Sequence, residues 1–317
     1  MGNLPAIRVT PSPTFGIVGV DYTGHFWLKH GIRGKSRTKV YLALFVCMVT
    51  KAVHIEIVSS LTTEAFLMAL KRFVSRRGIP TKIFSDNATT FVGANSQLHA
   101  LYNLFQSLAF QKQITDFCSN SSIDWTFIPP RSPHVGGIWE AGIKILKRHL
   151  LREIGEAVLS YEELLTTVTH VEAILNSRPL IRPSDDAAEF NYLTPAHFLI
   201  GRPLTALPDP NALQQQSVRC HWNQTQNALA NIWTRWTKEY LLSLQQRSKW
   251  TAVSPNIKSG TPVLLIDDNL PPLEWRLGVI TQTFPGRDGR TRTVQVQTKA
   301  GSFVRHIHRL CPLPIHD

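Results

Sequence analysis

Three acidic residues lie in sequence contexts that suit shared chemistry. Asp21 closes the apolar run "FGIVGVD", Asp86 closes "TKIFSD", and Glu140 follows the Gly-rich segment "SPHVGGIW". Carboxylates that meet at one point repel each other unless a cation joins them, and hard oxygen ligands select Mg²⁺ or Mn²⁺. Two such ions can hold the attacking and the leaving oxygen of an in-line phosphoryl displacement. The three acids therefore predict a two-ion site, provided that the fold brings them together.

Each of the three acids also has a simpler interpretation. An Asp at a strand end is commonly a turn former or a helix cap, and a Glu in a first helical turn favours the helix dipole. For any one acid alone the simpler interpretation is the better one. The metal site is favoured only by the combined context of the three segments.

The segments around the acids predict a mixed α/β core. Residues 15–21 and 81–86 read as strands that end on Asp21 and Asp86, and residues 25–58 read as antiparallel strands rich in β-branched and aromatic residues. Three antiparallel strands, a helix, a strand of the parallel type and then further helices form a ribonuclease-H-like mixed sheet with flanking helices. The predicted helices lie between Thr62 and Gly78, over 93–106, from Glu140 onwards, and after the capping box of Ser160 and Glu163.

The rest of the chain predicts a linker and a second, smaller fold. Residues 1–14 are an N-terminal connector, 15–180 the ribonuclease-H-like core, and 181–256 a Pro-rich connector with a Trp-rich helix over about 227–249. The apolar residues of that helix fall on one face, which is typical of a packing helix rather than of a base-stacking platform. Residues 257–317 alternate in the β manner between short turns and predict a small all-β SH3-like barrel.

Composition indicates a polyanionic partner. The 317 residues include 34 Lys and Arg against 22 Asp and Glu, a formal net charge of +12. Such a balance favours nucleic acid as the partner. The longest apolar run, Val40 to Val49, is far too short for a membrane span, and the N-terminus has no signal-peptide pattern. We therefore expect no membrane partner.

Several segments resemble retroviral-type integrases. The segments "VGVDYTG", "SDNATTFVGA" and "PPRSPHVGGIWEAGIKILKRHL" are similar to the three catalytic segments of that family. Further along the chain, "LTPAHFLIGRPLTALP" and "DDNLPPLEWRLGVITQTFPGRDGRTRTVQVQTKAG" resemble the integrase region of BEL/Pao-family LTR retrotransposon polyproteins. The likeness runs over nearly the whole chain.

The resemblance implies an enzyme and assigns its site. Asp21, Asp86 and Glu140 would be the metal-binding triad of a DDE integrase, which performs 3′-end processing and DNA strand transfer with two Mg²⁺ or Mn²⁺ ions. Five further residues are expected to contact DNA: Asn87, His134, Lys144, Lys147 and Arg148. Lys144 and Lys147 follow Glu140 at i+4 and i+7, so they share its helical face and would meet phosphates. The family also implies self-association, and the DNA substrate implies a nuclear location, with a cytoplasmic stage before import.

The sequence departs from the family pattern in three respects, one of which is "DYTGH" where "DYFGP" is common. The His/His/Cys/Cys zinc module that integrases carry before the core has no counterpart in this chain, and Ala88 stands where relatives have Gly. The main alternative is therefore a domesticated or truncated integrase-derived nucleic-acid-binding protein without catalysis. A ribonuclease-H-type nuclease acting on RNA–DNA hybrids is a further alternative, which the SH3-like segment and the integrase-like motifs disfavour.

Overall fold

The chain folds into two compact units, Met1–Leu175 and Asn176–Asp317, each with its own sheet. The structure is a computed structural model, and it describes residues 10–29, 37–85, 123–127, 147–148, 150–152, 154, 157–181, 192–206, 221–245, 256–267, 270 and 273–313. The predicted helix over 93–106 lies outside these ranges. Among the described helices, none is long and apolar enough to cross a membrane.

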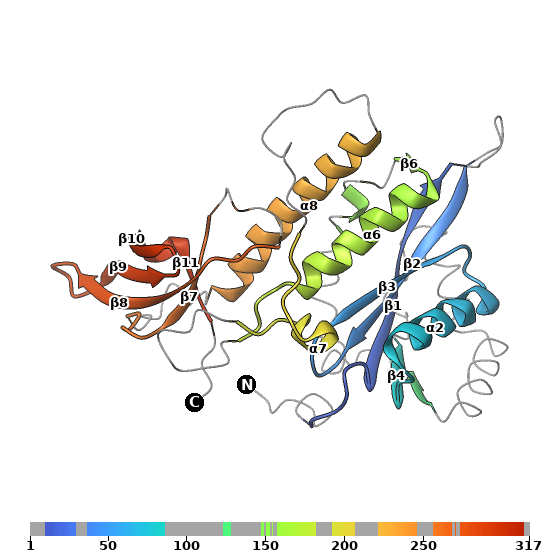
Figure 1. Cartoon of the computed structure of the whole chain (residues 1–317), viewed down its shortest axis with the longest axis horizontal. Coiled ribbons are helices and arrows are strands. Elements are labelled where there is room, and N and C mark those ends of the chain that lie inside the picture. Colours follow the sequence, from blue (N-terminus) through green and yellow to red (C-terminus); the bar gives the residue numbers. More distant parts are fainter. Residues whose placement is uncertain are drawn as a thin grey trace. The chain divides into compact units, whose positions relative to one another are not determined.

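The first unit is built on a mixed sheet with the strand order β3-β2-β1-β4-β5 (Figure 1). β1 (Ile17–Leu28) pairs antiparallel with β2 (Thr38–Cys47), which pairs antiparallel with β3 (Val53–Val58). On its other side β1 pairs in parallel with β4 (Lys82–Ser85), and β4 pairs in parallel with β5 (Asp124–Phe127). This order and these directions confirm the predicted ribonuclease-H-like mixed sheet.

The prediction that the first strand ends at Asp21 is wrong. β1 continues to Leu28, and its pairing with β2 extends to Leu28 opposite Thr38. Tyr22 and Phe26 stay buried, so the segment after Asp21 still contributes to the core. The register shifts between Gly24 and Phe26, a bulge that Gly24 permits with its φ of 112°. Beyond the bulge, β1 pairs in parallel with β6 (Val158–Leu159).

Helix α2 (Thr63–Arg77) packs on this sheet through aromatic side chains. Thr62 caps the helix by accepting a hydrogen bond from the Ala65 amide at 3.3 Å, and Gly78 ends it, as predicted. The ring of Phe73 stacks on that of Phe45 of β2, with centroids 4.3 Å apart and planes 8° apart. These contacts fix α2 against β2.

Helix α6 (Tyr161–Asn176) begins with the predicted capping box. The Glu163 amide donates to Ser160 Oγ at 3.2 Å, and the Ser160 amide donates to Glu163 Oε2 at 2.7 Å. Further along α6, Glu172 Oε2 accepts a hydrogen bond from the Ile55 amide at 2.9 Å. Since β3 lies at the edge of the sheet, this bond occupies a backbone donor that would otherwise be open to strand pairing.

Charged side chains, two of them buried, meet where β3, α2 and α6 come together. His54 and Glu56 are only 3% and 4% exposed, and His54 Nε2 lies 2.9 Å from Glu56 Oε1. Arg72 Nε donates to Glu56 Oε2 at 2.6 Å, and Arg77 Nη2 donates to Glu172 Oε1 at 2.6 Å. We call this set the ionic cluster: His54, Glu56, Arg72, Arg76, Arg77 and Glu172.

The second unit contains an antiparallel sheet with the order β10-β9-β8-β7-β11. Its elements are β7 (Pro262–Leu265), β8 (Leu277–Pro285), β9 (Thr291–Thr298), β10 (Gly301–His306), the 3-10 turn η2 (Ile307–Arg309) and β11 (Leu310–Pro312). The sheet curls around a core that includes Val263, Ile280 and Val296. The predicted small SH3-like fold is thus confirmed.

β7 is buried on both faces. Val263 and Leu265 point into the core of the curled sheet, whereas Leu264 joins a second cluster with Leu277 and Leu241. Leu241 belongs to α8 (His221–Leu244), the predicted Trp-rich helix, which begins at His221 rather than near Asn227. A short helix, α7 (His197–Ile200), precedes α8 and ends at Gly201 in the left-handed conformation.

Trp233 and Trp236 of α8 are buried, at 5% and 3% exposure. Their rings lie edge-on to Trp275, with centroids 5.2 and 6.0 Å away. This burial confirms that α8 is a packing helix, because these tryptophans have no open face for a base.

Candidate active site

Asp21 lies in the middle of β1, opposite Leu44 of β2. Its neighbours Val20 and Tyr22 are buried, whereas the Asp21 side chain keeps 26% of its surface exposed. The carboxylate therefore sits on a rigid, paired strand and remains open to ligands. A site residue held on a strand is positioned more accurately than one held on a loop.

The strand register pairs the two residues that precede two of the predicted ligands in the sequence. The parallel pairing of β1 and β4 runs up to Val20 opposite Ser85. Val20 precedes Asp21, and Ser85 precedes Asp86. Ser85 is fully buried, and its hydroxyl accepts a hydrogen bond from Trp125 Nε1 at 3.2 Å. The two predicted acids thus follow directly after a pair of residues held side by side in the centre of the sheet.

One oxygen of the Asp21 carboxylate forms an ion pair with a lysine side chain. Lys147 Nζ donates to Asp21 Oδ2 at 2.5 Å, and the Tyr22 amide donates to Asp21 Oδ1 at 2.7 Å. The Lys147 side chain is 23% exposed. One residue predicted to bind metal and one predicted to bind DNA are therefore in direct contact.

Lys147 is carried by a helical segment that is anchored to the first unit. Among the described residues of this segment, Leu150 and Ile154 are buried, at 0% and 3% exposure, and they are one helical turn apart. Arg148 and Arg152 are exposed. The buried pair fixes the segment on the core, while the cationic side chains lie toward solvent or toward Asp21.

Five of the predicted site residues lie outside the described ranges: Asp86, Asn87, His134, Glu140 and Lys144. Within those ranges no three His, Cys, Asp or Glu side chains group as a metal site. Of the predicted residues that are described, Asp21 and Lys147 meet, and Arg148 is exposed beside Lys147. The assignment of the triad therefore remains a prediction.

The chemistry of Asp21 fits a divalent cation. Its carboxylate oxygens are the hard ligands that Mg²⁺ and Mn²⁺ prefer, and Oδ2 already accepts a positively charged group. The ammonium of Lys147 stands in for a metal cation at this oxygen. Asp21 thus has the exposure and the ligand type that a metal site requires.

The contact between Asp21 and Lys147 was not predicted from the sequence, which assigned Lys147 to DNA phosphates alone. The two residues are 126 positions apart, and no local pattern links them. The ionic cluster was also missed, although alternating polar residues in "VHIEIV" were its one sequence signal.

Comparison with known proteins gives one family match and several related folds. Residues 220–313 match a family described as "Family of unknown function (DUF5641)". No curated protein matches the sequence. The family match covers most of the second unit but less than half of the chain.

Solved structures similar to this chain include several from retroviruses. A chain of the simian T-cell lymphotropic virus intasome, solved with the PP2A regulatory subunit B56 gamma, is 14% identical, with 96% of this chain and 81% of that chain covered and a TM-score of 0.40. The HTLV-2 integrase catalytic core domain with magnesium is 19% identical over 59% of this chain and 97% of its own, with a TM-score of 0.35. The BIV integrase catalytic core domain is 14% identical over 59% and 94%, with a TM-score of 0.37.

Proposed function

We propose that the chain is an integrase that processes the 3′ ends of an element's DNA and joins them to target DNA. The observation that supports the proposal is the pairing of Val20 with Ser85, because these two residues directly precede Asp21 and Asp86 in the sequence. The three catalytic-segment motifs of the sequence support the same assignment.

In this proposal Asp21, Asp86 and Glu140 hold two Mg²⁺ or Mn²⁺ ions. The ions would supply Lewis-acid stabilisation to the attacking and leaving oxygens of the phosphodiester. Asp21 contributes a carboxylate, and its backbone is held by pairing with β2. On the other side of β1, the pairing with β4 extends to Val20, the preceding residue. No side chain of the protein needs to act as a nucleophile, since water or a DNA 3′-hydroxyl attacks.

Lys147 is proposed to have two positions during the reaction. In the DNA-free protein its ammonium neutralises Asp21. When DNA binds, a phosphate offers the ammonium a second anion, and Asp21 becomes available as a ligand. Arg148 is exposed beside Lys147 and would add a further phosphate contact.

The finer assignments are part of the same proposal. The segments quoted above favour an LTR retrotransposon of the BEL/Pao family as the source. DNA is the proposed partner, since the net charge of +12 favours a polyanion. Self-association and a nuclear location follow from the proposed activity, because concerted joining of two DNA ends to a chromosome requires both.

The test is a disintegration assay on branched DNA with Mn²⁺, which demands less of an integrase than concerted strand transfer does. Wild type should give ligated product, whereas Asp21→Asn and Glu140→Gln should give none, because each removes a proposed metal ligand. Arg152→Gln is a matched control that changes an exposed cation near Lys147 and should retain activity.

Failure of the wild-type protein to give product would overturn the proposal, provided that the protein is folded and binds the branched DNA. Such a result would favour the alternative, an integrase-derived DNA-binding protein without catalysis. Activity that survives Asp21→Asn would contradict the assignment of the triad.

A further inference from the structure

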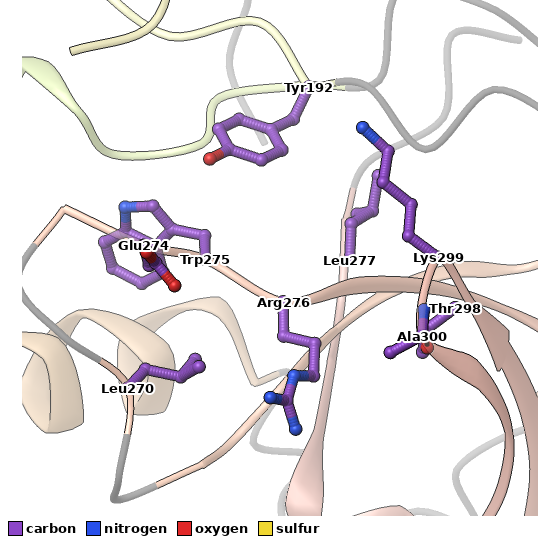
Figure 2. Close-up of a pocket in the computed structure, with 9 residues that line it drawn as sticks. All are labelled: Tyr192, Leu270, Glu274, Trp275, Arg276, Leu277, Thr298, Lys299 and Ala300. Carbon is purple, nitrogen blue, oxygen red and sulfur yellow. Dashed lines mark hydrogen bonds between the residues drawn. The ribbon is translucent and has the colours of Figure 1, made fainter. Parts of the chain in front are cut away.

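A pocket of about 250 Å³ opens on the second unit. Its lining residues, from Tyr192 to Ala300, all follow the three predicted acids in the sequence. Tyr192 and Trp275 provide aromatic walls, Leu277 an apolar one, and Glu274, Arg276 and Lys299 bring charge to it (Figure 2). Pockets for drug-sized ligands have about 300–1,000 Å³. This pocket is therefore suited to one ring-sized group rather than to a large ligand.

The aromatic wall is rigid. Trp275 meets Trp233, Trp236 and Tyr240 of α8 edge-on, with ring centroids 5.2, 6.0 and 5.7 Å away. Tyr192 packs against the buried cluster that contains Leu277. A ring that enters the pocket would thus meet walls that are already held in place, which reduces the entropy lost on binding.

The charged groups differ in how far they are already paired. Arg276 Nη1 donates to Asp267 Oδ2 at 2.7 Å, so its charge is largely balanced. For Glu274 and Lys299 the described part of the chain provides no hydrogen bond or ion pair. Burial, and then the charge of Glu274, raise the pKa of Tyr192 to about 12, so its hydroxyl stays protonated and can donate. The pocket therefore offers a carboxylate acceptor, a hydroxyl and a free ammonium.

This combination restricts the ligand. A simple cation would be attracted by Glu274 and the aromatic rings, but it would meet the charge of Lys299. A simple anion would meet the charge of Glu274. A neutral, flat ring with hydrogen-bond donors, linked to an anionic group, can pair with the aromatic walls, Glu274 and Lys299 at once. A nucleotide has this structure.

We propose that this pocket binds an unpaired nucleotide, with the base against Tyr192 and Trp275, its donor edge on Glu274 and its phosphate on Lys299. Guanine fits best, because its N1–H and N2–H₂ donors lie side by side and match the two oxygens of a carboxylate. The site accepts single-stranded DNA or RNA, since the groups it uses are common to both. It does not rest on the proposed integrase activity, because none of its residues belongs to the acidic triad.

The experiment measures binding of the full chain to fluorescent oligo(dT) that carries one central dG, one deoxyinosine or one abasic position. Deoxyinosine lacks only the N2 amino group of guanine. Wild type should bind the dG probe about tenfold more tightly than the deoxyinosine probe, as expected for a bidentate contact. Glu274→Gln should remove most of this preference, and the abasic probe should bind most weakly.

The control variant is Lys258→Gln, an exposed lysine of the same unit that does not line the pocket. It should weaken all probes equally, because it removes only a general positive charge, and should leave the dG preference intact. Oligo(U) probes with one G or one inosine distinguish RNA from DNA as the source of the nucleotide. Photocrosslinking of 6-thioguanine at the central position, which keeps the N1–H and N2–H₂ donors, should label Tyr192 or Trp275.

Equal affinity of wild type for the dG and deoxyinosine probes, or crosslinks that map elsewhere, would overturn the proposal. So would tight binding of a trimethyl-lysine peptide that Glu274→Gln abolishes, because the pocket would then be a cage for a cation. A folded wild-type protein that binds branched DNA and keeps the dG preference, but gives no disintegration product, would refute the integrase proposal only. The two proposals can thus fail separately.

Discussion

The ammonium of Lys147 lies 2.5 Å from Oδ2 of Asp21, so a predicted DNA contact neutralises a predicted metal ligand. Both side chains are about one quarter exposed, at 23% and 26%. At this exposure the ion pair contributes about 1 kcal/mol or less, because water screens it. The contact is therefore strong enough to compete with a bound cation and weak enough to be exchanged for a phosphate.

Replacing Lys147 with Gln should tighten binding of Mn²⁺ to the DNA-free protein. A cation that competes for Asp21 is removed, and the gain should be up to about fivefold for an ion pair of this strength. Free Mn²⁺ measured by electron paramagnetic resonance gives the affinity directly. Arg152→Gln, which changes an exposed cation in the same segment, should leave it unchanged. Equal affinities of wild type and Lys147→Gln would show that Lys147 does not compete with metal.

The ionic cluster should make the first unit less stable as the pH rises above neutrality. Burial alone would lower the pKa of His54, but hydrogen bonds to Glu172 and Glu56 outweigh it, so the pKa is raised above its ordinary 6.5. Burial would raise the pKa of Glu56, but hydrogen bonds from His54 and Arg72 outweigh it, so that pKa is lowered below 4.5. Charged His54 therefore contributes stability below pH 6.5, which is lost as the pH rises through its folded pKa.

The measurement is the melting temperature of the first unit as a function of pH. In wild type it should be highest between about 4.5 and 6.5 and should fall on the alkaline side. His54→Gln should flatten the alkaline fall, and Glu172→Gln should reduce it. His308→Gln, an exposed histidine of the second unit, is the control and should change neither limb. A wild-type alkaline limb identical to that of His54→Gln would contradict the role given to His54.

Local signals predicted most of the fold. The capping box of Ser160 and Glu163 is a short-range pattern, and both of its hydrogen bonds form. The course of β1 was mispredicted because the strand continues past Asp21 through a bulge at Gly24, which keeps Phe26 in the core. A bulge depends on pairing with a neighbouring strand, and the sequence of one strand does not contain that information.

The candidate site was predictable in its residue types but not in its contacts. Asp21 was identified by its position in an apolar run, yet its partner Lys147 is 126 residues away. The nucleotide pocket was missed for the same reason, since Tyr192 lies before α8 and Trp275 after it. Packing determines the contacts between distant segments, and the hydrophobic periodicity of a sequence does not predict them.

Gly278 should be essential for the second unit, because β8 and β9 approach each other closely there. A Cβ at this position would lie 2.3 Å from Val296 Cγ1 and 2.9 Å from the Gln297 carbonyl oxygen. Gly278→Ala should therefore lower stability by about 1–3 kcal/mol or more, as overpacking does, and urea unfolding followed by tryptophan fluorescence measures this. Gly289→Asn is the control: nothing lies within 4 Å of that position, and Asn tolerates its φ of 70°. Adding Val296→Ala to Gly278→Ala should recover only part of the loss, because the carbonyl clash remains. Unchanged stability of Gly278→Ala would show that the two strands can move apart at little cost.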